Sequence, residues 1–326
     1  MLGRFFYPDG IDLVNLGDVR AFMLVNDNLY NICVKPSARQ YSLQKHYDDI
    51  RDSGHQRSYA SETVLAETND PKFGLYLVLN HLIRHNVQFD FLDIGSFVGD
   101  VGLRYANFFR THEISCHVHC FDPTLAGQLV PYNIELNGLG RHVTHHPAAV
   151  SGVNGCVLFL ERRGHSDGSC ASDVPGVSAN SLVPSIRLSD FIRNHGIQNA
   201  FIKLDTENQE STILSEIDSF LQESINAVAF ECHCRDNEVF QRIETISRTH
   251  ALFDVGYVPK PFTFRHIPEG AAGVQSFRAS VASRPYAYTD VLAVSKNTPE
   301  LGALIRRLSV LETRPVAYSL IYERPA

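Results

Sequence analysis

The sequence predicts an α/β fold built on a mostly parallel sheet. Short apolar runs typical of buried strands alternate with stretches whose apolar residues recur at helical spacing. A glycine-rich turn, residues 95–99, follows one such run and opens a helix-like stretch. The predicted strands are Phe91–Ile94, His117–Phe121, His142–His146, Val157–Leu160, Phe201–Leu204, Ala227–Phe230, Phe253–Val258 and Thr289–Ser295. The predicted helices are Phe73–Ile83, Gly102–Phe109, Thr124–Leu136, Leu188–His195, Ser211–Gln222 and Glu238–Arg248, with a short helix after residue 299.

The composition is that of a globular protein with a core of its own. The 326 residues are 44% hydrophobic, and the net charge is −7 without any run of lysine or arginine. This charge argues against a nucleic-acid partner. Residues 1–20 carry Arg4, Asp9, Asp12 and Asp18, so they predict neither a signal peptide nor a membrane span. The seven cysteines, an odd number, favour reduced thiols and a cytoplasmic location.

The chain is expected to divide into three parts. Residues 1–70 form an N-terminal extension, residues 71–298 the main domain, and residues 299–326 a C-terminal helix and tail. The extension contains two β-prone runs, Ala21–Val25 and Leu29–Val34, separated by a polar linker that suits a hairpin turn. This extension would serve either as a substrate cover or as an oligomer contact, for instance in a homodimer.

The turn at residues 95–99 has the composition of a cofactor site. Gly95 and Gly99 lack a Cβ atom, so the backbone can turn tightly and approach a ligand closely. The amides in the first turn of the following helix would face that ligand. Glycine spacing of this kind occurs in NAD-binding folds, in S-adenosylmethionine (SAM) methyltransferases and in loops that bind nothing. The turn alone therefore leaves the cofactor open.

Polar residues end the predicted strands, at the edge where open α/β sheets bind ligands. Asp122 is suited to bind the two ribose hydroxyls that NAD and SAM share. Asp122-Pro123-Thr124 would also start a helix well, and the two roles are compatible. A short-chain dehydrogenase needs Tyr-x-x-x-Lys downstream of the turn, whereas Tyr41 and Lys45 lie upstream. An NAD(P)-dependent oxidoreductase is therefore kept only as the alternative.

Five sequence blocks, in order, resemble the FkbM family of SAM-dependent methyltransferases. They are residues 93–99, 120–123, 133–139, 183–191 and 201–207, and the likeness spans about residues 60–296. The resemblance implies a Rossmann-like class I methyltransferase fold, with a seven-stranded sheet, helices on both faces and an antiparallel last strand. It also implies SAM as cofactor, S-adenosylhomocysteine (SAH) as product, and O-methylation of a hydroxyl on a sugar or small natural product.

The resemblance also assigns cofactor contacts position by position. The methionine end of SAM would lie against the glycine turn, the ribose against the end of the second strand, and the adenine against the segment after the third. The assigned residues are Asp93, Gly95, Ser96 and Gly99, then Asp122 and Pro123, then Ala149, with Ser169 in a Gly/Ser-rich loop and Asp205 and Glu207 beside the methyl donor.

Three departures from the family pattern stand out. Ser96-Phe97 replaces the usual Ala-Asn, Asp122 replaces a longer Glu, and Asn208 replaces a Gly in the block that begins at Asp205. Asn is the best substitute for Gly at positive φ, so that turn can survive. A relative that binds SAM without turning it over is the third alternative.

Methyl transfer to an alcohol needs a proton acceptor and a geometry that excludes water. The candidate bases are Asp205, Glu207 and His233. Purely structural roles compete with this: a helix N-cap for Asp205 and a strand-end hydrogen bond for His233.

Cys232-His233-Cys234 does not predict zinc, because Cys-x-Cys on a strand puts the imidazole on the face opposite the sulfurs. No metal is predicted, and Asp205 with Glu231 is the pair that would hold a divalent ion if one were needed. The partner is expected to be a small-molecule or glycosyl hydroxyl acceptor, covered by the polar loop 161–183.

Overall fold

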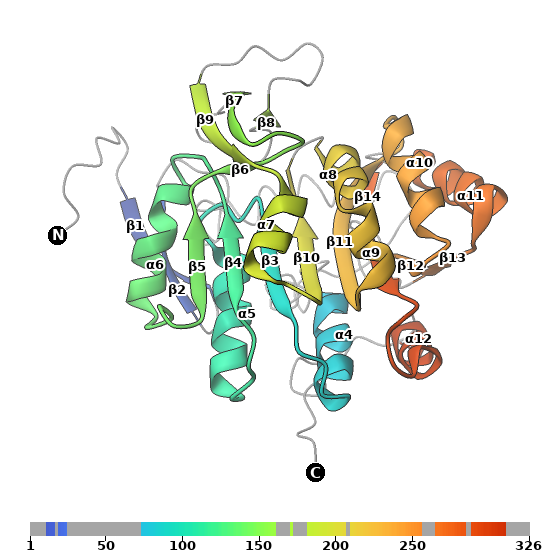
Figure 1. Cartoon of the computed structure of the whole chain (residues 1–326), viewed down its shortest axis with the longest axis horizontal. Coiled ribbons are helices and arrows are strands. Elements are labelled where there is room, and N and C mark those ends of the chain that lie inside the picture. Colours follow the sequence, from blue (N-terminus) through green and yellow to red (C-terminus); the bar gives the residue numbers. More distant parts are fainter. Residues whose placement is uncertain are drawn as a thin grey trace, which may run out of the picture. The chain divides into compact units, whose positions relative to one another are not determined.

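The computed structural model describes residues 11–16, 19–24, 73–160, 170–171, 181–206, 209–255, 265–284 and 288–310. Two compact units divide the chain. Unit 1 comprises Met1–Asp49, Phe91–Arg187 and Thr206–Gln209. Unit 2 comprises Ile50–Asp90, Leu188–Asp205 and Glu210–Ala326. Each is an arrangement of strands and helices (Figure 1).

Unit 1 contains three parallel strands in the order β3, β4, β5. Their bounds are Asp90–Ile94, Val118–Phe121 and Val143–His146. All residues of β4 and the last four of β3 are buried, as expected for strands covered on both faces. Helix α5, Asp100–Thr111, connects β3 to β4, and helix α6, Val130–Leu136, connects β4 to β5. The strands and α5 confirm the predicted elements to within two residues.

The predicted helix Thr124–Leu136 is wrong in its first half. Residues Gly127–Leu129 form a 3-10 turn, and α6 begins only at Val130. Pro131 sits in the first turn of α6, where a missing N–H costs nothing and the fixed φ favours a helix start. Upstream, the Thr124 N–H is already bound by the carboxylate of Asp122.

A second, smaller sheet in unit 1 has the order β6, β9, β7, β8. The bounds are Ala149–Val150, Ser181–Ile186, Gly155–Leu160 and Cys170–Ala171. One face is buried around Ala149, Phe159 and Val183. The expected loop 161–183 is therefore wrong at 170–171 and 181–183, which are strand. Pro184 masked the signal of β9, but this proline lies opposite Cys156 on the exposed face.

An N-terminal hairpin is present, and one of its two strands overlaps a predicted strand. Strand β1, Ile11–Leu16, pairs antiparallel with β2, Val19–Leu24, and Leu16 faces Val19. The predicted run Ala21–Val25 thus overlaps β2, but its partner precedes it in the sequence, while Leu29–Val34 lies outside the described residues. In β2 the alternate residues Val19 and Ala21 are buried, which fixes the register of the strand.

Unit 2 contains five strands in the order β10, β11, β14, β12, β13. Their bounds are Ala200–Leu204, Asn226–His233, Tyr288–Ser295, His250–Asp254 and Arg265–Ile267. Strands β10 and β11 are parallel, and β14 lies antiparallel between β11 and β12. The expected antiparallel last strand is confirmed. The two units hold eight such strands, three and five, where seven were expected, and β13 had not been predicted.

The helices of unit 2 agree with the prediction except at two places. Their bounds are α4 Phe73–Arg84, α7 Leu188–His195, α8 Glu210–Glu216, α9 Asp218–Glu223, α10 Asn237–Ile246, α11 Gly270–Ala282 and α12 Leu301–Val310. The predicted helix Ser211–Gln222 is broken at the buried Ile217. Helix α11 was missed because glycines 270 and 273 weaken its propensity. No helix in the described ranges is long and apolar enough to cross a membrane.

Two strand ends in unit 2 also differ from the prediction. Strand β12 begins at His250 rather than Phe253, and residues 256–258 of the predicted strand lie outside the described residues. Strand β11 continues beyond Phe230 because Glu231, Cys232 and His233 pair with residues 288–290 of β14. The three polar residues are thus part of the sheet.

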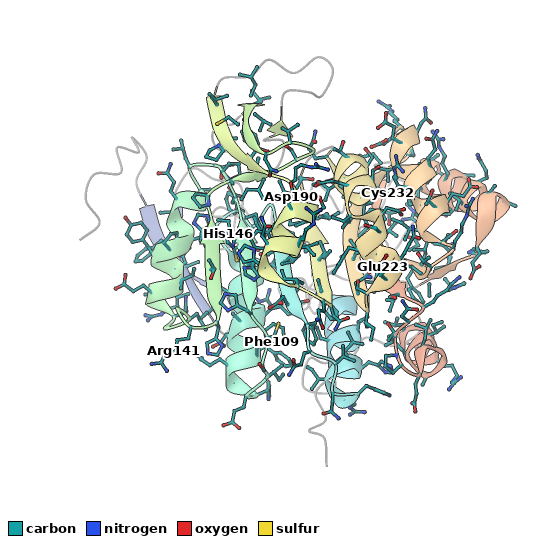
Figure 2. The ribbon with its side chains drawn as sticks, viewed as in Figure 1. Phe109, Arg141, His146, Asp190, Glu223 and Cys232 are labelled. Atoms are coloured by element: carbon teal, nitrogen blue, oxygen red, sulfur yellow. The ribbon has the colours of Figure 1, made fainter. Side chains whose placement is uncertain are left out.

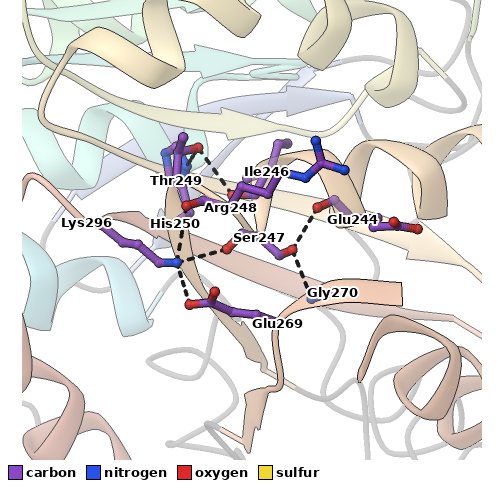
Figure 3. A network of polar contacts seen from close by, with 9 residues as sticks. All are labelled: Glu244, Ile246, Ser247, Arg248, Thr249, His250, Glu269, Gly270 and Lys296. Carbon is purple, nitrogen blue, oxygen red and sulfur yellow. Dashed lines mark hydrogen bonds and ion pairs between the residues drawn. The ribbon is translucent and has the colours of Figure 1, made fainter. Parts of the chain in front are cut away.

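Strand β12 begins at a buried histidine, His250, which lies near a group of hydrogen bonds made by Lys296 (Figure 3). Nε2 of His250 lies 2.7 Å from Oδ1 of Asn226. Nearby, Lys296 Nζ donates to the carbonyl oxygens of Ser247, at 3.1 Å, and Arg248, at 3.2 Å, at the end of α10. Burial lowers the pKa of His250 to about 4, and the Lys296 charge adds to this effect.

The protein is expected to lose stability as the pH falls from 6.5 to 4. In this range the unfolded state binds a proton at residue 250 and the folded state does not, so protonation favours unfolding. The effect of this residue is about 3 kcal/mol. Urea unfolding of the native chain and of His250→Asn at pH 7.5 and 4.5 measures it. An equal pH dependence in both proteins would contradict the assignment.

Candidate functional site

The turn between β3 and α5 has an unusual backbone. Gly95, Phe97 and Gly99 have φ values of 73°, 51° and 82°. The amides of Gly95 and Ser96 both donate to the Phe121 carbonyl, at 3.0 Å each, and the Gly99 amide donates to the Ser96 carbonyl at 2.6 Å. We call residues 95–99 the glycine loop. Glycine tolerates positive φ without strain, whereas Phe97 does not, so the surrounding structure must hold this residue in place.

Asp93 ties the end of β3 to the start of α5. Its carboxylate is fully buried, and Oδ2 accepts a hydrogen bond of 2.8 Å from the Gly102 amide. A Cβ atom on Gly102 would lie 2.5 Å from Cys120 Sγ and 3.0 Å from Asp93 Oδ2. The close packing of α5 on β3 and β4 therefore depends on this glycine.

Gly102→Ala is expected to lower the free energy of unfolding by about 1–3 kcal/mol, because the added methyl group overpacks the contact with Cys120. Gly302→Ala in α12 is the matched control. A Cβ there meets only Arg306 Nη1, at 3.7 Å. The control should gain up to about 1 kcal/mol from helix propensity. Thermal and urea unfolding measure both variants, and equal stabilisation of the two would contradict the packing.

Asp122 fastens the glycine loop to the end of β4. Its Oδ2 accepts from the Phe97 amide at 2.7 Å, while Oδ1 accepts from both the amide, at 2.8 Å, and the hydroxyl of Thr124. The residue is 5% exposed. Gly127 packs directly against it, because a Cβ there would lie 2.6 Å from Oδ1. The helix start anticipated at Asp122 is absent, because helical structure begins only at Gly127; Asp122 instead holds the turn at Thr124, and its ribose role stays a prediction.

The other predicted cofactor residues of unit 1 lie near this turn or outside the described residues. Ser96 is fully buried, and its Oγ has no hydrogen-bond partner within the ranges that the structure describes. Pro123 is half-buried and follows β4, and Ala149 is buried on β6 opposite Ser185 of β9. Ser169 lies outside the described residues.

His146 is the last residue of β5 (Figure 2). Its ring stacks on Phe121 with a centroid separation of 4.6 Å, and its carbonyl accepts from the Asp122 amide at 3.2 Å. Nε2 of His146 lies 3.1 Å from Nδ1 of His119 on β4. These contacts fix the end of β4, from which Asp122 projects.

In unit 2, two acidic residues stand at the ends of parallel strands. Asp205 follows β10 and forms an ion pair with the buried Lys203, with 3.3 Å between Nζ and Oδ2. Glu231, near the end of β11, pairs with His233 at 3.3 Å between Oε2 and Nε2. Because residues two apart on a strand share a face, both pairings follow from the strand geometry. Glu207 lies outside the described residues.

Cys232 points to the face of β11 opposite Glu231 and His233. It is fully buried, and burial, with the nearby carboxylates of Asp236, Asp254 and Glu231, raises the pKa of its thiol well above the usual value. Across the described part of the chain, no group of three His, Cys, Asp or Glu side chains is arranged to hold a metal ion.

Four features of these sites were not predicted from the sequence: the positive φ of Phe97, the contacts of Asn133 with Val98 and Phe22, and the partners of Asp205 and His233. The partners of Asp205 and His233 could have been predicted, because Lys203 and Glu231 each precede the side chain that they pair with by two residues. The first two depend on contacts between distant segments.

No protein-family model matches the chain, and no curated protein matches it. Several solved structures are similar to it at low identity. The structure of methyltransferase FkbM from Methylobacillus flagellatus KT is 12% identical, with a TM-score of 0.35, over 71% of this chain and 52% of that one. This chain therefore spans about half the length of that protein.

Two further structures cover most of both chains. Human methyltransferase-like protein 13 in complex with SAH is 11% identical, with a TM-score of 0.33, over 75% of this chain and 91% of that one. A putative class I SAM-dependent methyltransferase from Listeria monocytogenes is 8% identical, with a TM-score of 0.36, over 89% and 90%.

Proposed function

We propose that the protein is a SAM-dependent methyltransferase that resembles the FkbM family and transfers a methyl group to a hydroxyl of a sugar or small natural product. The observation that carries the proposal is the glycine loop. It lies between β3 and α5, three of its five residues have positive φ, and the carboxylate of Asp122 binds it from the end of β4. The five sequence blocks, in family order, support SAM over NAD(P) as the cofactor.

The residues around the loop fit a polar cofactor. The buried hydroxyl of Ser96 makes no hydrogen bond within the described ranges, and α5 begins directly after the turn, at Asp100, without a side-chain cap at Gly99. Gly95, Ser96 and Gly99 would hold the methionine end, Asp122 with Pro123 the ribose, and Ala149 the adenine. When bound, SAM supplies a methyl group on a positively charged sulfur, so the protein must provide placement and a proton acceptor.

His233 is the proposed proton acceptor. Its side chain is 46% exposed, and Nε2 points at the 23% exposed carboxylate of Glu231. The imidazole of His233 would take the proton of the acceptor hydroxyl, and the Glu231 carboxylate beside Nε2 would balance the resulting positive charge. Asp205 is less suited as a base, because Lys203 already balances its charge.

Thermal unfolding with added ligand tests the proposal against its alternatives. We expect SAM and SAH, but not NADH, to raise the midpoint of unfolding. A shift with NADH alone would favour an oxidoreductase and overturn the proposal. Where SAM binds, mass spectrometry of a panel of sugars and small alcohols incubated with SAM should find a methylated product. Binding without any product would support the non-catalytic alternative.

A further inference from the structure

The N-terminal hairpin is bound to α6 by two side-chain amides that imitate a neighbouring strand. Asn133 and Asn137 stand one helical turn apart. The Phe22 amide donates to Asn133 Oδ1 at 2.6 Å, and Asn133 Nδ2 donates to the Phe22 carbonyl at 3.2 Å. The Arg20 amide donates to Asn137 Oδ1 at 2.9 Å, and Asn137 Nδ2 donates to the Arg20 carbonyl at 2.6 Å. Figure 1 shows β2, in blue, beside α6.

Only Asn133 also reaches the glycine loop. Its Nδ2 donates a further hydrogen bond, of 2.9 Å, to the carbonyl of Val98, and the residue is fully buried. A primary amide has one acceptor oxygen and two N–H groups. With Phe22 bound to the oxygen and one N–H, the other N–H is left for Val98. The hairpin therefore determines the orientation of the Asn133 side-chain amide.

Val98 lies in the strained part of the loop. It lies between Phe97 and Gly99, with φ values of 51° and 82°, and the positive φ of Phe97 is unfavourable by about 1–2 kcal/mol. Asp122 holds the amide of Phe97, and Asn133 holds the carbonyl of Val98. The two side chains together keep the strained turn in one conformation.

We propose that the hairpin β1–β2 positions the cofactor loop through Asn133. Docking of β2 orients the Asn133 amide, the amide holds the Val98 carbonyl, and the loop then keeps the conformation against which the cofactor would bind. Asn133 is a positioning residue and does not touch the cofactor. The inference that the hairpin controls SAM affinity rests on the proposed function, whereas the inference that it orders the loop does not.

The chain offers a matched pair of variants. Asn133→Ala removes the hairpin contact and the loop contact, while Asn137→Ala removes a hairpin contact of the same kind and leaves Val98 bound. A second pair leaves both asparagines in place. Phe22→Pro deletes the amide that orients Asn133, and Arg20→Pro deletes the equivalent amide facing Asn137. Both amides donate to α6 rather than to β1, so neither proline removes a hydrogen bond between the two strands.

Hydrogen–deuterium exchange of the ligand-free full chain tests the ordering of the loop. In peptides covering residues 95–99, Asn133→Ala and Phe22→Pro should raise the exchange rate about fivefold or more, with no change for Asn137→Ala and Arg20→Pro. Equal rates in all four variants would overturn the proposal. So would an effect of Asn133→Ala without one of Phe22→Pro, because the hairpin would then have no part in it.

Calorimetric titration with SAH tests the link to the cofactor. Asn133→Ala and Phe22→Pro should weaken SAH binding about fivefold or more, and the two controls should bind as the native chain does. If the native chain binds no SAH, the proposed function fails and the exchange result still decides whether the hairpin orders the loop. If the native chain binds SAH and Phe22→Pro binds it with the same affinity, the inference that the hairpin controls cofactor affinity is overturned.

Discussion

Replacing Asp122 by alanine is expected to weaken SAH binding about 10- to 100-fold and to lower the free energy of unfolding by about 2–3 kcal/mol. The carboxylate accepts three hydrogen bonds, from the Phe97 amide and from the amide and hydroxyl of Thr124. Alanine leaves these donors without their acceptor and frees Phe97 from its positive φ. Any direct bond to the ribose is lost as well. Titration calorimetry and urea unfolding measure the two effects.

Asp236→Ala is the control for this experiment. Asp236 caps α10 by accepting from the amides of Glu238 and Val239, at 2.9 and 3.0 Å, so it is a capping aspartate in unit 2 rather than in unit 1. Its loss should cost about 1 kcal/mol of stability and leave SAH affinity unchanged. Asp122→Asn separates the roles further, since Asn keeps one acceptor and loses the charge. If Asp122→Ala binds SAH with native affinity, both the ribose role of Asp122 and its support of the loop are contradicted.

His233→Gln is expected to lower kcat for methyl transfer about 10²- to 10⁴-fold, with little change in SAH affinity. Glutamine keeps the size and polarity of the side chain but cannot accept a proton near neutral pH. Glu231→Gln should give a smaller decrease, because the charge that balances the protonated imidazole is removed while the base remains. Initial rates with the acceptor found in the hydroxyl panel, measured from pH 6 to 9, give the comparison.

Glu238→Gln provides the corresponding control. Glu238 is a carboxylate of α10 that accepts a 3.4 Å hydrogen bond from the Ser211 hydroxyl, and no role in the reaction is proposed for it. Its rate and pH profile should match those of the native chain. A His233→Gln protein with native kcat and an unchanged pH profile would show that another group accepts the proton.

The elements next to the candidate site were predictable because their signals are local. Strands β3, β4, β10 and β11 are short, mostly apolar runs, as expected for strands that are buried on both faces. The turn at residues 95–99 was predictable because glycines mark positions of positive φ. In the N-terminal hairpin, strand β2 was predicted but its partner β1 was not. The sequence pattern of a two-stranded hairpin is too weak to show which neighbouring segment pairs with a given strand.

The contacts that hold the loop could not be read from the sequence. The hydrogen bond between Phe22 and Asn133 joins residues 111 positions apart, and the bond between Phe97 and Asp122 joins residues 25 apart. Helix α11 escaped prediction for a related reason. Gly273 looks like a helix breaker, yet a Cβ there would lie 2.1 Å from the Pro268 carbonyl oxygen, so tertiary packing requires the glycine. Propensity alone cannot reveal such a requirement.

Calorimetric titration of the native full chain with SAH tests the central claim most directly. The account predicts saturable binding at one site, with a micromolar dissociation constant that weakens in Asp122→Ala and is unaffected in Asp236→Ala. NADH added in place of SAH should give no binding heat. Absence of binding heat with SAH, or the same affinity in all three proteins, would contradict the assignment of the glycine loop as a SAM site.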